Sequence, residues 1–423
     1  MLKMKRLASL ATFGLLGSLI GTASADVVTD WNEITMSTVS VQRPGPTGML
    51  DVALVHVAMH DAVQSIEKRY EPYNVEIKGA KGSRTAAATA AAYGVLAAIT
   101  VDPTLKANLD AAYFDYLAKH GLSGDPGIQV GTAVAERILP LRRANPANPE
   151  EFRGGNEIGM WRPTVSYLPG PPASEAPMHA PWLARFDPFT LTGPARFRAD
   201  PPPALRSERY RKDYDEVKAV GSRNSKVRTR QQTDLAHFYN DNFFTQWNRV
   251  LRTVAKRYIR DTGDSARLFA LANMAASDAL ITCWDSKMTY VFWRPVTAIQ
   301  NGNYDGNPKT VGDANWQPLA NTPNYPDYTS GANSVVAAMT RTMERYFGTD
   351  RKTFEVTTLS DPATTKTRVY RRFSEAADDV VNARIYLGFH FRFADTAART
   401  QGEKVADWAF DHFLLPKARK VQK

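Results

Sequence analysis

The chain has 423 residues, and its 43% hydrophobic and 10% aromatic content is enough to bury a sizeable core as one large domain or two packed ones. A net charge of +10 could indicate a protein that binds nucleic acid, but the basic residues form no stripe interleaved with aromatic side chains. The densest basic cluster, 206–230, is interrupted by acidic residues, so we expect a solvated helical face there and no nucleic-acid partner. The single cysteine, Cys283, excludes a disulfide framework and leaves any metal site to histidine and carboxylate ligands.

Residues 1–25 differ in kind from the rest of the chain. A basic start, "MLKMKR", precedes the apolar run "LASLATFGLLGSLIG" and the small-residue site "TASA". This pattern predicts a secretory signal peptide that is cleaved after Ala25. The apolar run is shorter than the roughly 20 residues that a spanning helix needs, and no later segment is long and apolar enough. We therefore expect a soluble mature protein, periplasmic or secreted, without a membrane-spanning segment.

Helical periodicity dominates the chain, and no convincing series of alternating strands is present. The first half, 26–143, is expected to hold helices at about 46–67, 83–99, 103–119 and 126–143. Thirteen of the 26 prolines lie between Pro146 and Pro203, which predicts that 144–205 is an extended connection wrapping the surface. In the second half, 206–423, helices are expected at about 206–219, 231–258, 264–289, 331–347, 370–388 and 394–415. The predicted fold class is all-α, with helices packed as bundles.

Two cations stand out in the stretch "WDSKMTYVFWRP". Lys287 and Arg294 are seven residues apart, which is two turns of a helix, so both are expected to leave the same helix face. Pro295 should stop or kink that helix directly behind Arg294. Taken alone, both side chains have an ordinary interpretation as charges that face solvent.

A helix start and a histidine follow further along the chain. In "PDYTSGANSVV", Ser330 can cap a helix and Gly331 lets the backbone approach a ligand, so the free N–H groups and the helix dipole would favour an anion. In "ARIYLGFHFRFAD", Arg384 and His390 are six apart, so the chain should turn near Gly388 and present His390 from a loop or helix start. The ordinary interpretations are a simple cap for Ser330 and a satisfied core histidine for His390. Together with the two upstream cations, these groups suit the oxygens of a tetrahedral or trigonal-bipyramidal oxyanion.

The order Lys-x6-Arg-Pro, then Ser-Gly, then Arg-x5-His resembles the vanadium-dependent haloperoxidases and the type 2 phosphatidic acid phosphatase superfamily to which they belong. Trp284, "FWRP", "RIYLGFHFRFAD" and the N-terminal "LVHVAMHDAVQSI" are similar to the soluble, exported haloperoxidase branch. The resemblance implies an all-α fold built from helical bundles of the vanadium chloroperoxidase and acid phosphatase type. It places the oxyanion site in the C-terminal half.

The resemblance also implies roles for the matching residues. The oxygens of vanadate, or of phosphate in the same site, would be bound by Lys287, Arg294, Ser330, Gly331 and Arg384. His390 would be the axial vanadate ligand, or the nucleophile that forms a phosphohistidine. Asp395 would orient the imidazole by accepting a hydrogen bond from its other nitrogen.

The chain departs from the family pattern at Ala332, where Pro-Ser-Gly-His has a histidine that moves protons. Another residue supplies the proton, the reaction needs none, or the site binds without efficient turnover. The candidates for a replacement are Asp327, Tyr328, Asn333 and, further away, His237.

Three functions follow from these alternatives: a haloperoxidase that oxidises halide with hydrogen peroxide, a periplasmic acid phosphatase acting on phosphate esters, or an oxyanion-binding protein with lapsed catalysis. Outside this constellation, His56 and His60 are four residues apart on a helix, but their apolar neighbours favour burial over metal binding. Tyr325 lies near the expected oxyanion, where an aromatic contact with the site and plain packing are both open.

Overall fold

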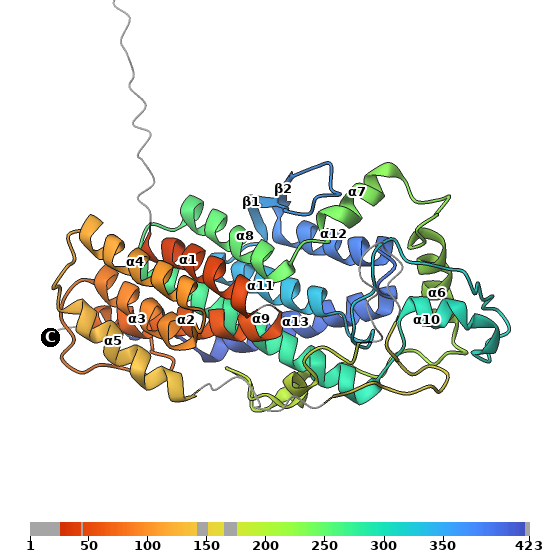
Figure 1. The fold of residues 1–423 in the computed structure, drawn as a ribbon, viewed down its shortest axis with the longest axis horizontal. Helices are drawn as coiled ribbons and strands as arrows, with labels where there is room; N and C mark the ends of the chain where they lie inside the picture. Colours follow the sequence, from red (N-terminus) through yellow and green to blue (C-terminus); the bar gives the residue numbers. More distant parts are fainter. Residues whose placement is uncertain (1–25, 44, 142–150, 165–175, 419–423) are drawn as a thin grey trace, which may run out of the picture.

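The computed structural model describes residues 26–43, 45–141, 151–164 and 176–418. The expected signal peptide, 1–25, and parts of the proline-rich connection lie outside these residues. The first half holds five helices in its described part, and Figure 1 shows them gathered at one end of the molecule: α1 (Val27–Gln42), α2 (Pro46–Glu67), α3 (Arg84–Ile99), α4 (Pro103–Lys119) and α5 (Gly127–Ile138).

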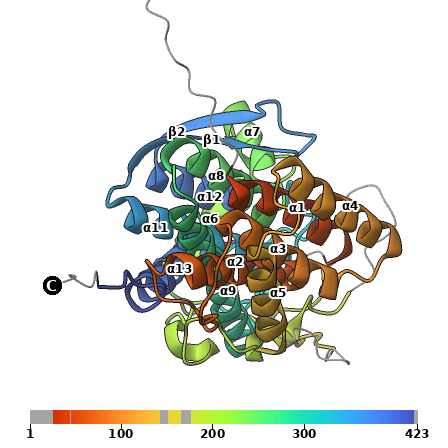
Figure 2. The ribbon, with the colours of Figure 1, turned by 90° about the vertical axis from the view of Figure 1, so that its left-hand side faces the viewer.

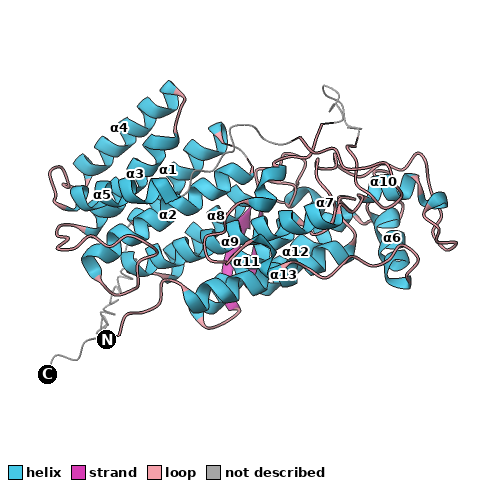
Figure 3. Ribbon diagram, turned by 90° about the horizontal axis from the view of Figure 1, so that it is seen from below, coloured by secondary structure: helices cyan, strands magenta, loops and turns pink. Residues whose placement is uncertain are grey.

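The second half adds eight α-helices and one hairpin within the described residues. The helices are α6 (Glu208–Val220), α7 (Arg230–Phe238), α8 (Phe243–Tyr258), α9 (Thr262–Tyr290), α10 (Pro295–Gln300), α11 (Gly331–Phe347), α12 (Phe373–Tyr386) and α13 (Arg392–His412). Strands β1 (Arg351–Thr357) and β2 (Thr367–Arg372) pair antiparallel and lie against the helices, as Figure 3 shows. The all-α prediction is confirmed.

Several element boundaries differ from those expected. The helix predicted over 231–258 is two helices, because Asn242 accepts from the backbone N–H groups of Phe244 and Thr245 and so starts α8 anew. Helix α1 was not expected, since its sequence is rich in β-branched residues that favour strands. Strand β2 occupies the start of the segment predicted as a helix from 370.

Helix α9 is the centre of the molecule. It is buried on all sides from Ser265 to Lys287 and packs against helices of both halves, α2, α11 and α13. Figure 2 shows α9 beneath α2 when the molecule is viewed along its length. A single hydrophobic cluster runs from α1 to the end of α13, so the two helical halves share one core.

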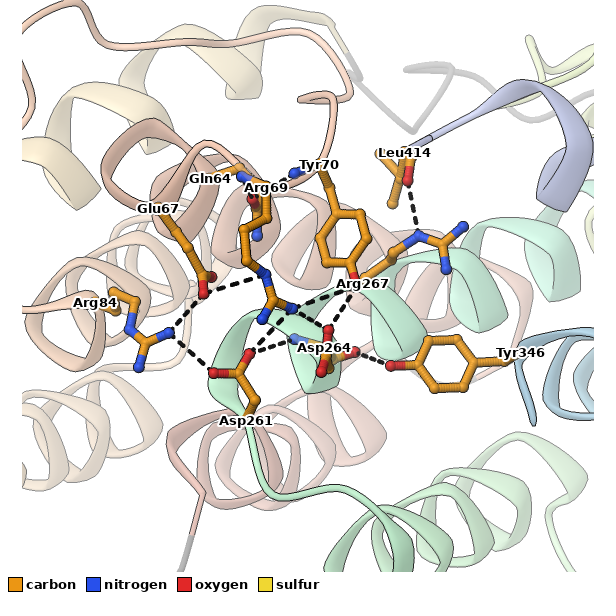
Figure 4. Close-up of polar contacts among 10 residues, drawn as sticks. All are labelled: Gln64, Glu67, Arg69, Tyr70, Arg84, Asp261, Asp264, Arg267, Tyr346 and Leu414. Atoms are coloured by element: carbon orange, nitrogen blue, oxygen red, sulfur yellow. Dashed lines mark hydrogen bonds and ion pairs between the residues drawn. The ribbon is translucent and has the colours of Figure 1, made fainter. Parts of the chain in front are cut away.

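Polar contacts join the start of α9 to both halves (Figure 4). Asp264 binds Arg69, which follows α2, and accepts a hydrogen bond of 2.6 Å from the Tyr70 hydroxyl. The Tyr346 hydroxyl of α11 donates to the backbone oxygen of Asp264 at 2.9 Å. These contacts tie the N-terminal end of α9 to helices on either side of it.

The described part of the proline-rich connection is partly buried, whereas the sequence predicted that it wraps the surface. Within its described part, Trp161 and Leu183 are buried, and Asp278 of α9 accepts from the backbone N–H groups of Phe189 and Thr190 at 2.6 and 2.7 Å. A carboxylate buried in the central helix therefore fixes this segment. No helix in the described ranges is long and apolar enough to span a membrane.

Candidate functional site

Lys287 and Arg294 do not share a helix. Helix α9 ends at Tyr290, and Arg294 is the N-cap of α10, whose first residue is Pro295. The expectation that both cations leave one helix face is therefore wrong, because the helix stops one turn earlier than the spacing required.

Although α9 ends between them, Lys287 and Arg294 both contact the same loop. Lys287 Nζ donates to the Pro326 oxygen at 2.5 Å and the Asp327 oxygen at 3.2 Å, and Arg294 Nε donates to the Tyr325 oxygen at 2.8 Å. Both cations are fully buried, so neither is a surface charge. They hold the backbone of residues 325–327 from two sides.

Arg384 and His390 approach this loop from the end of α12. The chain turns at Gly388, whose φ of 78° confirms the predicted turn; a Cβ there would lie 2.6 Å from the Gly221 oxygen. His390 is buried, and Arg294 Nη1 lies 3.0 Å from its Nε2. Arg384 is also buried and donates from Nη1 to the Tyr239 oxygen at 2.9 Å.

The carboxylate beside His390 belongs to Asp327. Its Oδ1 lies 2.8 Å from His390 Nδ1, whereas Asp395 accepts from Asn333 Nδ2 at 2.8 Å. The first turns of α13 and α11 face each other, and this directs Asp395 to Asn333 and away from the imidazole. The orienting contact expected of Asp395 is thus made by Asp327. A carboxyl oxygen that accepts at Nδ1 places the ring proton on that nitrogen and leaves the Nε2 lone pair directed toward Arg294.

Ser330 and Gly331 lie where the sequence places them, at the start of α11. Ser330 occupies the N-cap position without a side-chain capping bond, and its Oγ accepts from Asn333 Nδ2 at 3.3 Å. Gly331 packs against Trp284, since a Cβ at residue 331 would lie 3.2 Å from the indole ring. Ala332 is buried in the next position and offers no group that moves a proton.

Burial controls the protonation of this cluster. It lowers the pKa of Lys287 to about 7 and lowers the pKa values of Arg294 and Arg384. Burial and then the three nearby cations lower the pKa of His390 well below its ordinary value. The imidazole is therefore neutral at neutral pH, which is the state that can act as a ligand or a nucleophile.

The two carboxyl groups shift in the opposite direction. Burial raises the pKa of Asp327 well above its ordinary value and that of Asp395 to about 7, although neighbouring cations oppose both shifts. The cluster thus holds three cationic side chains and two carboxyl groups that resist ionisation.

Among the described residues of this cluster, two guanidinium donors have no partner. Arg294 Nη2 and Arg384 Nε are buried without a hydrogen bond. Buried polar atoms are seldom left unsatisfied, so these N–H groups are suited to an acceptor on a bound group. Asp327 Oδ2 and Asp395 Oδ2, in the same cluster, also have no hydrogen-bond partner. Oxyanion oxygens suit the two arginine donors, because they accept charge-assisted hydrogen bonds from guanidinium groups. The donor set therefore fits vanadate or phosphate beside His390.

A cavity of about 300 Å³ adjoins the cluster. Arg384 lines it directly, together with the aromatic rings of Phe243, Phe244, Trp284, Tyr325 and Phe389. The Tyr325 ring lines this space and contacts the other two cations, since Lys287 Nζ and Arg294 Cζ each lie 4.8 Å from its centroid. Tyr325 therefore contacts the site through cation–π interactions, which decides between the two interpretations of this residue.

The remaining candidates lie elsewhere. His237 is half-buried on α7 and does not line the cavity. The Tyr328 hydroxyl donates to the Asp200 oxygen at 2.7 Å. His56 and His60 are core histidines whose Nε2 atoms contact Asn32 and the Glu71 oxygen, as their apolar neighbours predicted. In the described part of the chain, no group of three or more histidine, cysteine or acidic side chains is placed to hold a metal ion.

Sequence reasoning missed two features of the site. The contact between Asp327 and His390 had a weak signal, an acidic residue three positions before Ser330. His179 lines the cavity from the proline-rich connection, a segment that offered no periodicity from which its position could be inferred.

Comparisons with known proteins agree with this geometry. Residues 267–415, which carry all the site residues that the sequence predicted, match the family model of the VCPO second helical-bundle domain. Vanadium chloroperoxidase from Curvularia inaequalis is 26% identical over 297 residues, which cover 54% of this chain and 48% of that protein. The matched region thus spans about half the length of this curated relative.

Solved structures extend the likeness over most of the chain. The first bacterial vanadium-dependent iodoperoxidase has a TM-score of 0.77 at 22% identity, covering 93% of this chain and 98% of that one. An apo-type bacterial vanadium-dependent chloroperoxidase has a TM-score of 0.71 at 18% identity, covering 87% and 93%. The fold is that of these helical-bundle proteins, and the resemblance to the vanadium haloperoxidase superfamily is confirmed.

Substituting the arginines with unpartnered donors tests the site directly. We expect Arg294→Gln and Arg384→Gln each to weaken binding of tungstate, a tetrahedral oxyanion, by about 10- to 100-fold, because each removes a charge-assisted hydrogen bond. Isothermal titration calorimetry measures the affinity. Arg368→Gln, in strand β2, is the matched control, because Arg368 Nε is also buried without a partner but the residue pairs with Asp234 and does not line the cavity. Equal affinities in all four proteins would show that these donors do not face an anion.

The pH dependence of anion binding follows from the pKa values of about 7 for Lys287 and Asp395. Above pH 7, Lys287 loses its positive charge and Asp395 gains a negative one, and both changes oppose an anion. We expect tungstate affinity to fall by up to about tenfold per group and per pH unit between about pH 7 and about pH 8.5. Tungstate keeps its double charge in this range, so titrations at several pH values report the protein groups. An affinity that stays constant or rises with pH would contradict this reading.

Proposed function

We propose that this chain is a haloperoxidase-like enzyme that holds vanadate through His390 and oxidises halide with hydrogen peroxide. The observation that carries the proposal is the pair of unpartnered donors, Arg294 Nη2 and Arg384 Nε, buried in the same cluster as a neutral imidazole. The named relatives, a vanadium chloroperoxidase and a vanadium-dependent iodoperoxidase, support the choice of vanadate.

In this proposal, each residue of the site has a separate role. His390 Nε2 would hold vanadium, and Lys287, Arg294 and Arg384 would neutralise the oxygens, with Ser330 and Gly331 at the start of α11 completing the cradle. When bound, vanadate supplies a Lewis-acid centre that activates peroxide for the oxidation of halide. Asp327 Oδ1, 2.8 Å from His390 Nδ1, would accept the ring proton's hydrogen bond and leave the Nε2 lone pair available.

The aromatic wall of the cavity has a second effect. The rings of Tyr325, Trp284 and Phe389 line the cavity beside Arg384 and offer few hydrogen-bonding groups to water. In a site with little water, each cation interacts more strongly with a bound anion than it would at the surface. The same pocket suits a phosphate ester, so an acid phosphatase with His390 as the nucleophile is the second candidate. Ala332 favours a third candidate, an oxyanion-binding protein without efficient turnover.

Activity assays separate these three functions. We expect the purified protein to gain bromide-oxidising activity when orthovanadate is added, and to lose it in His390→Ala by more than about 100-fold, because the vanadium ligand is gone. Hydrolysis of a chromogenic phosphate ester without vanadate, absent from His390→Ala, would support the phosphatase instead. Tight vanadate binding with negligible turnover in both assays would support the oxyanion-binding protein.

We also propose that the protein is exported, on the basis of the basic start, apolar run and "TASA" site of residues 1–25. The expected mature chain begins at Asp26, which lies at the N-cap of α1 and accepts from the Val28 N–H. N-terminal sequencing of protein recovered from the periplasm or the medium measures this. A cytoplasmic protein that retains Met1 would contradict export.

A further inference from the structure

His179 lies between two hollows of the molecule. It lines the cavity of about 300 Å³ that Arg384 and Tyr325 share, and it also lines an outer hollow of about 530 Å³ with Glu151, Thr47 and others. Among the described residues that line these two spaces, His179 is the one common to both. An imidazole in this position connects the inner cavity with the outside of the molecule.

The backbone of residue 179 is fixed to the candidate site. Its N–H donates to the Asn324 oxygen at 2.9 Å, and its oxygen accepts from Trp284 Nε1 at 3.1 Å. Trp284 in turn packs on Gly331, at the start of α11. Trp284 therefore links the backbone of residue 179 to Gly331, which precedes Ala332 in the sequence.

The ring itself points toward the start of α2. A Cβ at Gly45 would lie 2.8 Å from His179 Nε2, and Gly45, with a φ of 75°, also lines the inner cavity. Glycine at this position leaves room for the imidazole, which any side chain would displace. Nε2 thus lies beside Gly45, which lines the inner cavity.

The chemistry of the site calls for such a group. Ala332 carries no proton, and His390 is committed to Asp327 and Arg294. Burial lowers the pKa of His179 below its ordinary value, so the imidazole is largely neutral at pH 7 and can accept a proton. The charged groups that face the same cavity are Arg384 and Asp241, and Asp241 is paired with Arg249 at 2.5 Å.

We propose that His179 is the proton-transfer group of this site, taking a proton from hydrogen peroxide in the inner cavity and passing it to water in the outer hollow. The O–H bond of the peroxide breaks, its electron pair stays on oxygen, and the proton joins one ring nitrogen while the proton of the other ring nitrogen leaves. This inference rests on the proposed function, since it assigns the peroxide step of that reaction.

Kinetics of two substitutions test the assignment. In vanadate-loaded protein, we expect His179→Ala and His179→Gln to lower kcat/KM for peroxide by about 100-fold, the usual contribution of a general base. Added imidazole should restore activity to His179→Ala, which leaves a space for it, and not to His179→Gln. His237→Ala, a half-buried histidine of α7 outside the cavity, is the control and should keep full activity.

A measurement without vanadate or peroxide keeps the inference independent of turnover. Tungstate should raise the pKa of His179 by about one pH unit, because a dianion in the shared cavity stabilises the imidazolium. Proton NMR of the histidine rings follows this, with the signal assigned by its absence from His179→Gln. Full activity in both variants, or tungstate binding without a shift of this signal, would overturn the role of His179. Failure of tungstate to bind at all would overturn the oxyanion site itself, and the proposed function with it.

Discussion

The burial of three cations at the middle of a helical bundle is the constraint on which the rest of the site depends. Removing a lone ammonium or guanidinium group from water costs several kcal/mol, and here Lys287, Arg294 and Arg384 are buried together. Backbone oxygens of residues 325–327, 389 and 239 offset part of this cost. The remaining cost of burial is reflected in the lowered pKa values of the three cations and in the guanidinium N–H groups that have no acceptor. A bound oxyanion would supply acceptors for these donors and would offset the burial of the three cations.

Helix termini bring the pieces of this cluster together. The end of α9 supplies Lys287, the start of α10 supplies Arg294, and the end of α12 with the turn that follows supplies Arg384 and His390. The starts of α11 and α13 face each other through Asn333 and Asp395. Because helix termini leave backbone N–H and C=O groups without intrahelical partners, a junction of several termini is rich in polar groups. The long buried helix α9 makes this junction rigid, since it packs against both halves of the chain.

The sequence predicted much of this arrangement and missed the parts that depend on tertiary contacts. The bounds of α2, α4 and α11 agree with the predicted ranges, because apolar periodicity and N-terminal proline or glycine signals mark them. The predicted end of the central helix, at about 289, agrees with α9, which ends at Tyr290. The shared helix face of Lys287 and Arg294 was wrong because it required this helix to continue for one more turn. Asp327 and Asp395 each offer a carboxyl group that, from its position in the sequence, could reach the His390 ring. Only the packing of α11 against α13 decides which of the two does so.

Ala332 has no group that can transfer a proton, so anion binding and proton transfer have to be considered separately in this site. Binding of an oxyanion needs fixed cations and a neutral imidazole, and the packing of this chain supplies both without residue 332. Proton transfer needs a titratable group that reaches both the reacting atoms and the solvent. The start of α11 is buried, so a group there would have to exchange protons through the cavity, whereas His179 lies on the path between the cavity and the outside. The three cations and the proposed proton-transfer residue, His179, lie on different segments. Changes in the segment that carries His179 would therefore alter the rate of the proposed reaction with peroxide and leave the affinity for the anion unchanged.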